Sequence, residues 1–396
     1  MRTVPKYKVL HLVDSSGLYG AETVILNLSR EMMKSEFAPI VGMISRNNST
    51  PELAVTAKRL GIETMMVQTK FRFDPSGAFG INNYLAKQKI DIIHSHGYKP
   101  SLLAFLPGLV FKIPLMVTCH LWLSTGDAKL RFYHEMESRV MKVIPAVVGV
   151  SEEICREIVA KGVDYRKVKL IHNGVDLSNY PKYPKEDARA LIRNLKIDEG
   201  DFVIGTAGRM HWQKAYHYLL DAVKGLRDRN ILVKCVVFGD GPLRKDLEAQ
   251  RNELGLQDIV CFPGFRNDLV NLFDFIDIFV LTSVDEGLPM VLLEAMASRK
   301  AIISTPVGAI KTVLTHGKDV LFYDTGNINM LSNYMIDLKN NPARRKELGE
   351  AAYHTFTSGF SGKIMAEKYV SLYYSLLTSR EKNIRKAIEK HNVFAN

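Results

Sequence analysis

Short apolar runs alternate along this chain with longer segments whose apolar residues have helical spacing, and this alternation constrains the fold more than any other feature. Three segments of the first half are expected to be helices: Glu22–Met33, Glu52–Leu60 and Gly80–Lys89. Strands that alternate with helices predict a parallel sheet with helices on both faces. The apolar runs expected to form buried strands in the first half are Val9–Val13, Pro39–Ile44, Thr64–Val67, Ile90–His94, Leu115–Cys119 and Ala146–Val150.

The second half repeats this pattern. Its expected strands are Phe202–Thr206, Ile231–Phe238, Ile259–Phe262, Ile278–Leu281 and Ala301–Ser304. After Asn327 the pattern is helical to about Thr378, and a polar, basic tail follows. We therefore predict an α/β protein with two Rossmann-like domains facing each other across a cleft, where the carboxyl ends of the strands bind ligands.

The domain boundaries follow from local composition. Residues 173–186 include Gly174, Pro181 and Pro184 and few apolar side chains, as is typical of a linker. The predicted domains are therefore an N-terminal domain at 1–172 and a C-terminal domain at 187–360. Residues 361–396 are expected to form a C-terminal helix and a basic tail that return to the first domain.

Composition excludes several classes of protein. Hydrophobic residues make up 46% of the chain and charged residues 24%, which argues against disorder and low complexity. The four cysteines lie far apart without a C-x-x-C pair, which argues against a disulfide framework or a structural zinc site. No run of about 18 apolar residues could span a bilayer, and the apolar run within the first 13 residues is too short for a signal peptide. We therefore expect a folded protein of the cytoplasm.

The positive charge is concentrated in the first half. Residues 1–185 contain 25 Lys and Arg against 16 Asp and Glu, whereas residues 186–396 contain 28 against 26. This imbalance suggests an anionic partner for the first half, such as a membrane surface, a phosphorylated lipid or a nucleic acid. Aromatic residues interleaved with Lys and Arg, or a recognition-helix pattern, would support nucleic acid, and neither is present, so we expect no nucleic-acid partner.

One segment carries the sharpest chemical signal, EGLPMVLLEAMAS at residues 286–298, directly after an expected strand. Its Pro289 suits the first turn of a helix, so the amides of Met290 and Val291 would be free to bind a phosphate. Glu294 would lie one turn further, within reach of a ribose hydroxyl, and Glu286 would precede the helix in a loop. The alternative is an ordinary helix on which Glu294 is a solvated surface charge.

Two further strand-to-helix turns point to phosphate binding. Arg209 and Lys214 follow a strand in GRMHWQK, and an Arg fork with a mobile ammonium can neutralise a leaving diphosphate. Gly17 and Gly20 fall in the first such turn, where a missing side chain lets a phosphate approach the backbone. The G-x-x-G spacing differs from the dinucleotide fingerprint G-x-G-x-x-G, which disfavours a dehydrogenase.

Histidines end two strands of the first half. His120 closes the strand LMVTCH, where its imidazole could bond to a sugar hydroxyl. We interpret His94 and His96 of DIIHSHG as structural, and only His120 as a catalytic candidate.

The 286–298 segment resembles the double-glutamate motif of the retaining GT-B-fold glycosyltransferases known as glycosyl transferases group 1, with two glutamates eight positions apart around G-L-P, where Leu288 lies. Other blocks resemble the same family in the same order along nearly the whole chain. They are GLYGAETVILNLS at 17–29, DIIHSHG at 91–97, VTCH at 117–120, VGVSEE at 148–153, LIHNGVD at 170–176, GTAGRMHWQKA at 205–215, VVFGDGPLRKDLE at 236–248 and VCFPGF at 260–265.

The resemblance implies a function. A UDP- or GDP-linked sugar would be the donor, with its ribose on Glu294, its diphosphate on Arg209 and Lys214, and its base near Phe265 and Arg266. The Gly17–Gly20 turn would close over the donor phosphates, His120 would meet the transferred sugar and Glu286 would orient its hydroxyls. The family also implies retention of configuration. The first domain would hold the acceptor, a cell-envelope or lipid-linked glycan, and we expect no metal or cofactor because cationic side chains can stabilise the leaving diphosphate.

Alternatives and departures remain. A GT-B-fold nucleotide-sugar epimerase or a glycan phosphorylase would share the fold, and a basic nucleic-acid-binding protein is an alternative of another class. Where the family usually shows G-G-I-P-E, this chain has G-A-I-K-T at 308–312, without the acidic residue.

The segment at 127–144 carries an apolar stripe that either packs on the first sheet or forms a basic amphipathic face. In the second case the protein would attach peripherally to an anionic membrane. The stripe consists of Leu130, Tyr133, Met136, Val140 and Ile144, with Lys129, Arg131, Arg139 and Lys142 around it.

Overall fold

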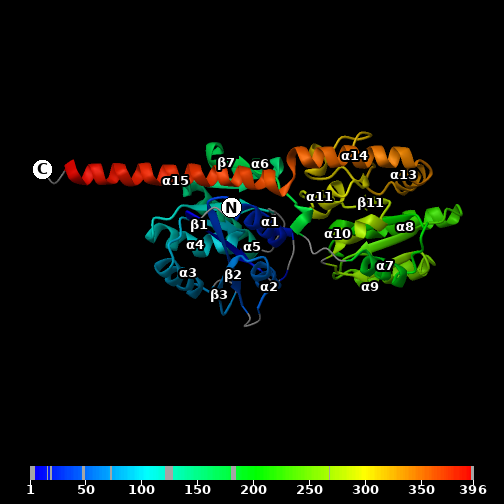
Figure 1. The fold of residues 1–396 in the computed structure, drawn as a ribbon, viewed down its shortest axis with the longest axis horizontal. Helices are drawn as coiled ribbons and strands as arrows, with labels where there is room; N and C mark the ends of the chain where they lie inside the picture. The colour runs from blue at the N-terminus through cyan, green and yellow to red at the C-terminus, as the bar shows by residue number, and fades with distance from the viewer. Residues whose placement is uncertain are drawn as a thin grey trace. The chain divides into compact units, whose positions relative to one another are not determined.

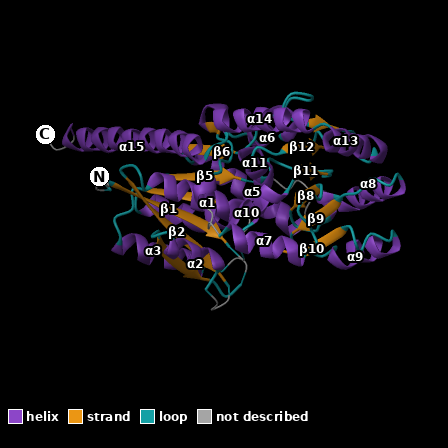
Figure 2. Ribbon diagram, turned by 45° about the vertical axis from the view of Figure 1, so that its right-hand side comes forward, coloured by secondary structure: helices purple, strands orange, loops and turns teal. Residues whose placement is uncertain are grey.

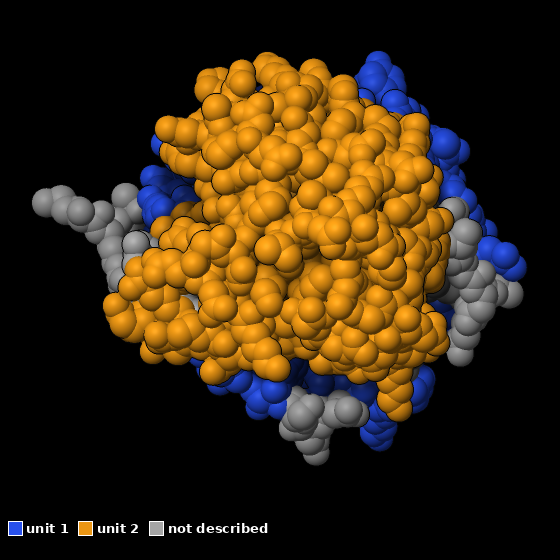
Figure 3. Space-filling model, turned by 90° about the vertical axis from the view of Figure 1, so that its right-hand side faces the viewer, with its two compact units in different colours: residues 1–174, 362–396 blue, residues 175–361 orange. Residues whose placement is uncertain are grey.

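A computed structural model describes residues 5–15, 17, 20–46, 50–71, 74–120, 128–179, 184–266 and 268–393. The chain divides into two compact units, which Figure 3 shows in separate colours. Unit 1 contains residues 1–174 and 362–396, and unit 2 contains residues 175–361. The C-terminal helix is therefore part of the first unit, and Figure 1 shows it in red alongside helix α1.

Unit 1 is built on a seven-stranded parallel sheet with the order β3-β2-β1-β4-β5-β6-β7. Its strands are β1 (Tyr7–Asp14), β2 (Phe37–Ser45), β3 (Glu63–Gln68), β4 (Ile92–His96), β5 (Leu115–Cys119), β6 (Ala146–Gly149) and β7 (Val168–Leu170). Its helices are α1 (Gly20–Met32), α2 (Glu52–Arg59), α3 (Ser76–Lys87), α4 (Tyr98–Val110), α5 (Ala128–Val143), α6 (Glu152–Ala160) and α15 (Gly362–Val393), with a 3-10 helix η1 (Tyr165–Lys167).

Unit 2 is built on a six-stranded parallel sheet with the order β10-β9-β8-β11-β12-β13. Its strands are β8 (Val203–Ala207), β9 (Lys234–Phe238), β10 (Val260–Gly264), β11 (Ile278–Leu281), β12 (Ala301–Ser304) and β13 (Leu321–Phe322). Its helices are α7 (Lys185–Asn194), α8 (Tyr216–Asp228), α9 (Arg244–Glu253), α10 (Leu269–Leu272), α11 (Met290–Ala297), α12 (Ile310–Val313), α13 (Ile328–Asn340) and α14 (Pro342–Gly359). Three 3-10 helices, η2 (Leu177–Asn179), η3 (Trp212–Lys214) and η4 (Phe273–Phe275), complete it.

Both units therefore have the α/β architecture expected of Rossmann-like domains, with orange strands between purple helices in Figure 2. In each sheet the strand order reverses direction beside the first strand, between β1 and β4 in unit 1 and between β8 and β11 in unit 2. Ligands of open parallel sheets bind at the carboxyl ends of the strands at this switch point. These two edges are therefore the places where ligand-binding residues are expected.

Several boundaries differ from those expected. Strand β4 runs over Ile92–His96, two residues later than expected, so both histidines of DIIHSHG lie in the strand. Helix α4 contains Pro107, although proline is usually disfavoured in the interior of a helix. Helix α15 continues to Val393 rather than ending near Thr378, because the polar tail is rich in Arg, Lys, Glu and Ala, which favour helices.

The C-terminal part of the apolar stripe packs inward, as expected if the stripe packs on the first sheet. Val140 and Ile144 are buried in the core of unit 1, Tyr133 and Met136 are half-buried, and the side chains of Lys129 and Leu130 lie outside the described residues. Arg131, Arg139 and Lys142 are exposed. Within the described part of the chain, no helix combines the length and the apolar character needed to cross a membrane.

Candidate active site

The loop after β8 is shaped by glycine at the switch point of unit 2. Gly208 has a φ of +155°, and a β-carbon there would lie 2.8 Å from Cε of Lys214. The turn of the GDGP sequence packs on this loop, since the Met210 amide donates to the Asp240 carbonyl (2.9 Å) and the Leu243 amide to the Met210 carbonyl (3.1 Å). Glycine therefore leaves room for the Lys214 side chain, and the GDGP turn supports the loop through these backbone bonds.

Lys214 and Glu286 form an ion pair at this edge. Lys214 Nζ contacts Glu286 Oε1, and the two side chains are 15% and 12% exposed. Ser283 Oγ donates to the same carboxylate oxygen at 2.8 Å, and Thr282 Oγ1 donates to the Lys214 carbonyl at 2.7 Å. The loops after β8 and β11 are thus tied together by both charge and hydrogen bonds, so two sequence-predicted residues 72 positions apart meet at one place.

Arg209 leaves the same loop with an exposed side chain. It forms no ion pair with another residue of the described chain, so its guanidinium is available to an anion. Together with Lys214 it provides two cations after one strand, which is the charge arrangement expected for a diphosphate.

Helix α11 follows the Glu286 loop. It begins at Met290, with Pro289 as the extended residue before it rather than in the first turn. The Met290 and Val291 amides have no acceptor within the helix, and the helix dipole places positive charge beside them. Glu294 is 8% exposed, so it is not the solvated surface charge of the alternative interpretation, and Leu288 packs into the core of unit 2.

Phe265 and Arg266 follow β10, at the outer edge of the same sheet. The Phe265 ring is 56% exposed. Arg266 Nε donates to Asp268 Oδ1 at 2.7 Å, so its guanidinium is held by a neighbouring carboxylate. The exposed ring is suited to a flat ligand group, whereas Arg266 is engaged within its own loop.

The G-A-I-K-T loop supports the same site through its glycine. Gly308 has a φ of +51°, and the Ala309 amide donates to the Gly287 carbonyl at 3.2 Å. Lys311 is exposed on the short helix α12 that follows. The departure from the family pattern therefore changes an exposed charge and leaves the backbone contact in place.

At the edge of unit 1, the G-x-x-G turn connects β1 to α1. Gly20 is the first residue of α1, and Ser15 Oγ donates to the Gly17 carbonyl at 2.9 Å. Residues 16, 18 and 19 lie outside the described residues. The two glycines are thus placed at the carboxyl end of the first strand, as expected.

His120 follows β5 and contacts a second histidine. His96 Nδ1 lies 2.9 Å from His120 Nε2, and His11 Nδ1 lies 3.2 Å from His96 Nε2. Burial lowers the pKa of His120 to about 4 and that of His11 to about 3. These imidazoles are therefore neutral at pH 7, and His96, interpreted as structural from the sequence, is a direct partner of the catalytic candidate.

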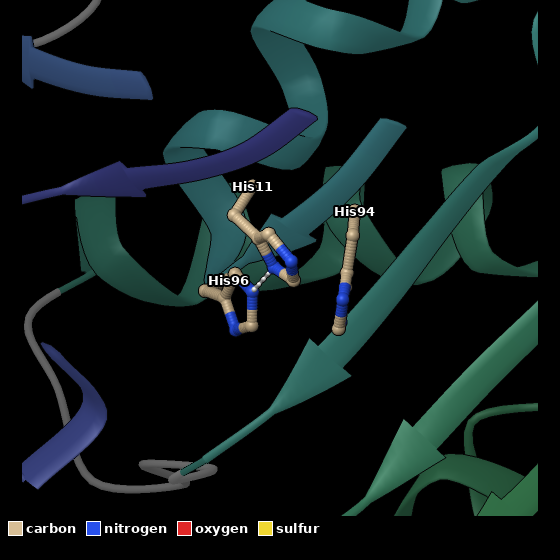
Figure 4. Close-up of side chains that lie close together, drawn as sticks. All are labelled: His11, His94 and His96. Carbon is tan, nitrogen blue, oxygen red and sulfur yellow. Dashed lines mark hydrogen bonds between the residues drawn. The ribbon is translucent and has the colours of Figure 1, made fainter. Parts of the chain in front are cut away.

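The same cluster offers three nitrogens that could hold a metal ion. One nitrogen from each of His11, His94 and His96 lies within 4.8 Å of the other two (Figure 4). Five of their six ring nitrogens already have hydrogen-bond partners, because His94 bonds to Tyr373 Oη and Thr118 Oγ1, both at 2.7 Å. A metal ion would have to displace these bonds.

Sequence reasoning missed a buried lysine in unit 1. Lys99 is 1% exposed, and its Nζ lies 3.0 Å from Oδ1 of Asp14 at the carboxyl end of β1. The two residues lie 85 positions apart, and nothing in the local sequence of either indicates the other. The pair places a charge-compensated ammonium beside the G-x-x-G turn.

Two family profiles match the chain. The family described as Glycosyl transferases group 1 matches residues 187–355, and the family described as Glycosyltransferase Family 4 matches residues 19–179. The UDP-Gal:alpha-D-GlcNAc-diphosphoundecaprenol alpha-1,3-galactosyltransferase of Escherichia coli is 24% identical over 390 residues, covering 96% of this chain and 99% of that protein. A lipopolysaccharide core biosynthesis glycosyltransferase of Rhizobium meliloti is 31% identical over 180 residues, covering 46% of this chain and 51% of its own.

Solved structures share the fold. HepE of Anabaena, crystallised with UDP and glucose, superposes with a TM-score of 0.79 at 20% identity, and the match covers 93% of this chain and 100% of the HepE chain. A glycosyltransferase of Rickettsia africae gives a TM-score of 0.79 at 19% identity, with 94% and 99% coverage. The expected GT-B fold with two Rossmann-like domains is confirmed.

Proposed function

This chain belongs to the group 1 family of glycosyl transferases and transfers a sugar, and we propose that its donor is a nucleoside diphosphate sugar and that the anomeric configuration is retained. The observation that carries the proposal is the Lys214–Glu286 pair beside the start of α11. It sets a cation, a carboxylate and unpaired helix amides at one switch point, which suits a diphosphate that carries a polyhydroxylated group.

In this proposal each predicted site residue of unit 2 has its own role in the reaction. Arg209 and Lys214 neutralise the leaving diphosphate with the Met290 and Val291 amides. An ammonium has three N–H donors, so Lys214 can keep Glu286 as a partner while it binds a phosphate oxygen. Glu286, fixed by that bond and by Ser283, orients sugar hydroxyls rather than acting as a covalent nucleophile.

The nucleoside is held further along the same edge. Buried Glu294 accepts from the ribose hydroxyls, and the base lies near Phe265 and Arg266. Uracil is favoured over guanine because the name of the Escherichia coli relative specifies a UDP-linked donor and HepE was crystallised with UDP. In unit 1, Gly17 and Gly20 give the phosphates access to the backbone, and His120 meets a hydroxyl of the transferred sugar. No metal is needed in this scheme, since the side-chain cations supply the charge.

The proposed acceptor is a lipid-linked or cell-envelope glycan at the cytoplasmic face of a membrane. The name of the Escherichia coli relative specifies a diphosphoundecaprenol-linked acceptor. In unit 1 an α4 apolar patch, defined as Leu106, Leu109 and Val110, is 65%, 60% and 64% exposed, and α4 packs beside α5. An α5 basic set, defined as Arg131, Arg139 and Lys142, is exposed on that neighbouring helix. Apolar and basic side chains together suit peripheral binding to an anionic bilayer.

A two-stage experiment tests the reaction. The first stage measures thermal stabilisation by UDP, GDP and ADP, since a ligand that binds only the folded state raises stability with occupancy. The second incubates the protein with UDP-sugars and a GlcNAc-diphosphoprenol acceptor and assigns the anomeric configuration of the product by NMR. We expect stabilisation by UDP and a product with retained configuration. Sugar epimerised without acceptor, or released onto inorganic phosphate, would instead identify an epimerase or a phosphorylase.

A further inference from the structure

We propose that His96 and His11 are positioning residues for His120, and that the three rings form one hydrogen-bonded chain in which every ring carries its proton on the same kind of nitrogen. The inference rests on the proposed function in one respect, namely that His120 meets a sugar hydroxyl. The hydrogen-bonded chain of His11, His96 and His120 lies entirely within unit 1.

The sheet register brings the rings together. His11 on β1 is paired with His94 on β4, and His96 on β4 is paired with Thr118 on β5. Residues two apart in a strand point to the same face, so the rings of His11, His94 and His96 share one face of the sheet (Figure 4). His120 follows β5, and its ring stacks on that of His96 with centroids 5.2 Å apart.

The hydrogen bonds fix the proton positions relative to one another. Each link joins an Nδ1 to an Nε2, namely His96 Nδ1 to His120 Nε2 and His11 Nδ1 to His96 Nε2. A neutral imidazole has one N–H donor and one bare acceptor. If His120 donates from Nε2, then His96 must accept at Nδ1 and donate from Nε2, and His11 must accept at Nδ1 and carry its proton on Nε2. The only other neutral arrangement has all three protons on Nδ1.

All three rings are held neutral. Desolvation is the largest cause that lowers the pKa of His96 well below its usual value, and it acts alike on His11 and His120. The chain therefore has two neutral states and no charged state at pH 7. A change from the Nε2 state to the Nδ1 state moves one proton along each link, and it keeps the rings neutral only because His120 Nδ1 also gains a proton and His11 Nε2 loses one.

The two ends of the chain are open. His11 Nε2 and His120 Nδ1 are buried atoms without a hydrogen-bond partner among the described residues. His120 Nδ1 is a bare acceptor when all protons are on Nε2 and an N–H donor when all are on Nδ1. His120 can thus either accept from or donate to a ligand without becoming charged.

This property selects a class of ligand group. A hydroxyl can donate or accept, so it can pair with either state of His120. A phosphate oxygen can only accept, so it would pair with the donor state of His120 alone. A neutral ring would also bind it more weakly than the cationic side chains of unit 2 do. The chain therefore suits His120 to a neutral hydroxyl, such as that of a sugar.

His94 is a neighbour but not a member of the chain. Its ring centroid lies 4.1 Å from that of His96, yet its two nitrogens bond to Tyr373 Oη and Thr118 Oγ1. Thr118 Oγ1 also lies 3.0 Å from Tyr369 Oη, so His94 belongs to a hydroxyl network with α15. A variant at His94 is a matched control, because this ring is also buried and lies against His96 without bonding to it.

The test is to measure the tautomers directly. In the full-length protein labelled with ¹⁵N-histidine, two-bond ¹H–¹⁵N correlation spectra distinguish Nδ1–H from Nε2–H rings at pH 7. We expect the same tautomer at His11, His96 and His120, and no change at His120 in His94→Asn. Different tautomers among the three rings in the wild-type protein would overturn the chain, and this result requires no variant to fold.

A pair of substitutions separates the two links. In His96→Asn the amide lies at the position of Nδ1 and keeps a partner for His120, whereas in His96→Gln it lies at the position of Nε2 and keeps a partner for His11. We expect two results in His96→Gln and not in His96→Asn. His120 should show a mixture of tautomers, and turnover should be about tenfold lower, which corresponds to the loss of about one hydrogen bond. Equal effects of both variants on His120 would count against the chain.

Two further outcomes are decisive. Binding of Zn²⁺ alone at micromolar concentration with shifts at His11, His94 and His96 would assign the cluster to a metal instead. Matching tautomers in a protein that shows no sugar transfer would leave the chain intact and would count against the proposed function, so the two failures are distinguishable.

Discussion

Gly308 lies against the backbone of Glu286, so closely that a β-carbon at position 308 would stand 1.6 Å from the Glu286 carbonyl oxygen. The carboxylate of the same residue contacts Lys214. The loop that departs from the family pattern therefore determines where Glu286 sits, through its glycine and not through the exposed Lys311. Any larger residue at position 308 must move the backbone of Glu286.

We expect Gly308→Ala to lower both stability and turnover. The φ of +51° costs an L-residue about 1–2 kcal/mol, and the collision with Glu286 adds to this. Gly317→Ala is the control, because Gly317 has a φ of +75° and, apart from its chain neighbours, no described residue lies within 4 Å of the place that a β-carbon would take there. Chemical denaturation and sugar-transfer assays should show a loss of turnover only in Gly308→Ala. Equal turnover in the two variants would show that the contact is dispensable.

Arg209→Ala and Lys214→Ala are each expected to lower turnover by about 10²-fold or more, because each removes a preorganised charge that stabilises the leaving diphosphate. The two should differ in stability. Arg209 is exposed, so its loss should leave the midpoint of thermal unfolding unchanged, whereas loss of Lys214 leaves Glu286 without its ion-pair partner. Near-normal turnover in both variants with an active donor would refute the assignment.

The two glutamates are expected to separate by ligand. Glu294→Gln should weaken binding of UDP alone, because the buried carboxylate accepts from the ribose hydroxyls. Glu286→Gln should leave UDP affinity within about threefold of the wild type and lower turnover, because its carboxylate acts on the sugar. Isothermal titration with UDP decides between these roles. Equal losses of UDP affinity would mean that the roles are wrongly divided.

The unit 2 edge could be predicted because its signals are local. Gly208, Arg209 and Lys214 lie within seven residues after one strand, and Glu286 and Glu294 flank one helix start. Local turn and capping chemistry therefore places each of them at the carboxyl edge. The contact of Lys214 with Glu286 then follows from the order of β8 and β11 in the sheet.

The unit 1 network could not be predicted in the same way. It depends on the register of three strands that are separated in sequence, and a shift of one residue would turn a side chain to the other face. The expected strand ended at His94, whereas β4 ends at His96, so the direct partner of His120 was placed outside the strand. The Asp14–Lys99 pair has the same origin, since it joins the end of β1 to a helix that follows β4.

Stability should fall as the pH is lowered from about 6.5 to about 4. The folded-state pKa values of His11 and His120 are lowered by burial to about 3 and about 4, so the unfolded chain binds more protons than the folded chain in this window. Each such group contributes about 1.4 kcal/mol of lost stability per pH unit. Denaturation curves should therefore show a shallower pH dependence in His11→Asn and an unchanged one in the control His354→Asn, whose side chain is exposed. The same slope in both would contradict the buried neutral state.

Membrane binding is expected to have an apolar component. Replacement of the α4 apolar patch by serine removes three side chains that are more than half exposed, so it should not disturb the core. It should lower the fraction of protein that sediments with anionic vesicles at high salt, where charge is screened. Unchanged sedimentation at high salt would show that the patch does not enter the bilayer.

The electrostatic component of membrane binding should be lost at high salt or when the α5 basic set is neutralised. Each Lys or Arg near an anionic surface contributes about 1 kcal/mol, so neutralising the three residues should weaken binding to anionic vesicles by about 10²-fold at low salt. Neutral vesicles should bind the wild type and this variant equally and more weakly, because only the α4 apolar patch acts on them. A matched control neutralises three exposed lysines of unit 2, Lys245, Lys318 and Lys346, which removes the same net charge from the other part of the chain. Because the screening length is about 10 Å at 0.1 M salt, only charges that face the bilayer should matter, and the control should bind as the wild type does. An equal loss of vesicle binding in the two variants would show that net charge alone accounts for the binding. An acceptor in solution would then be the better proposal.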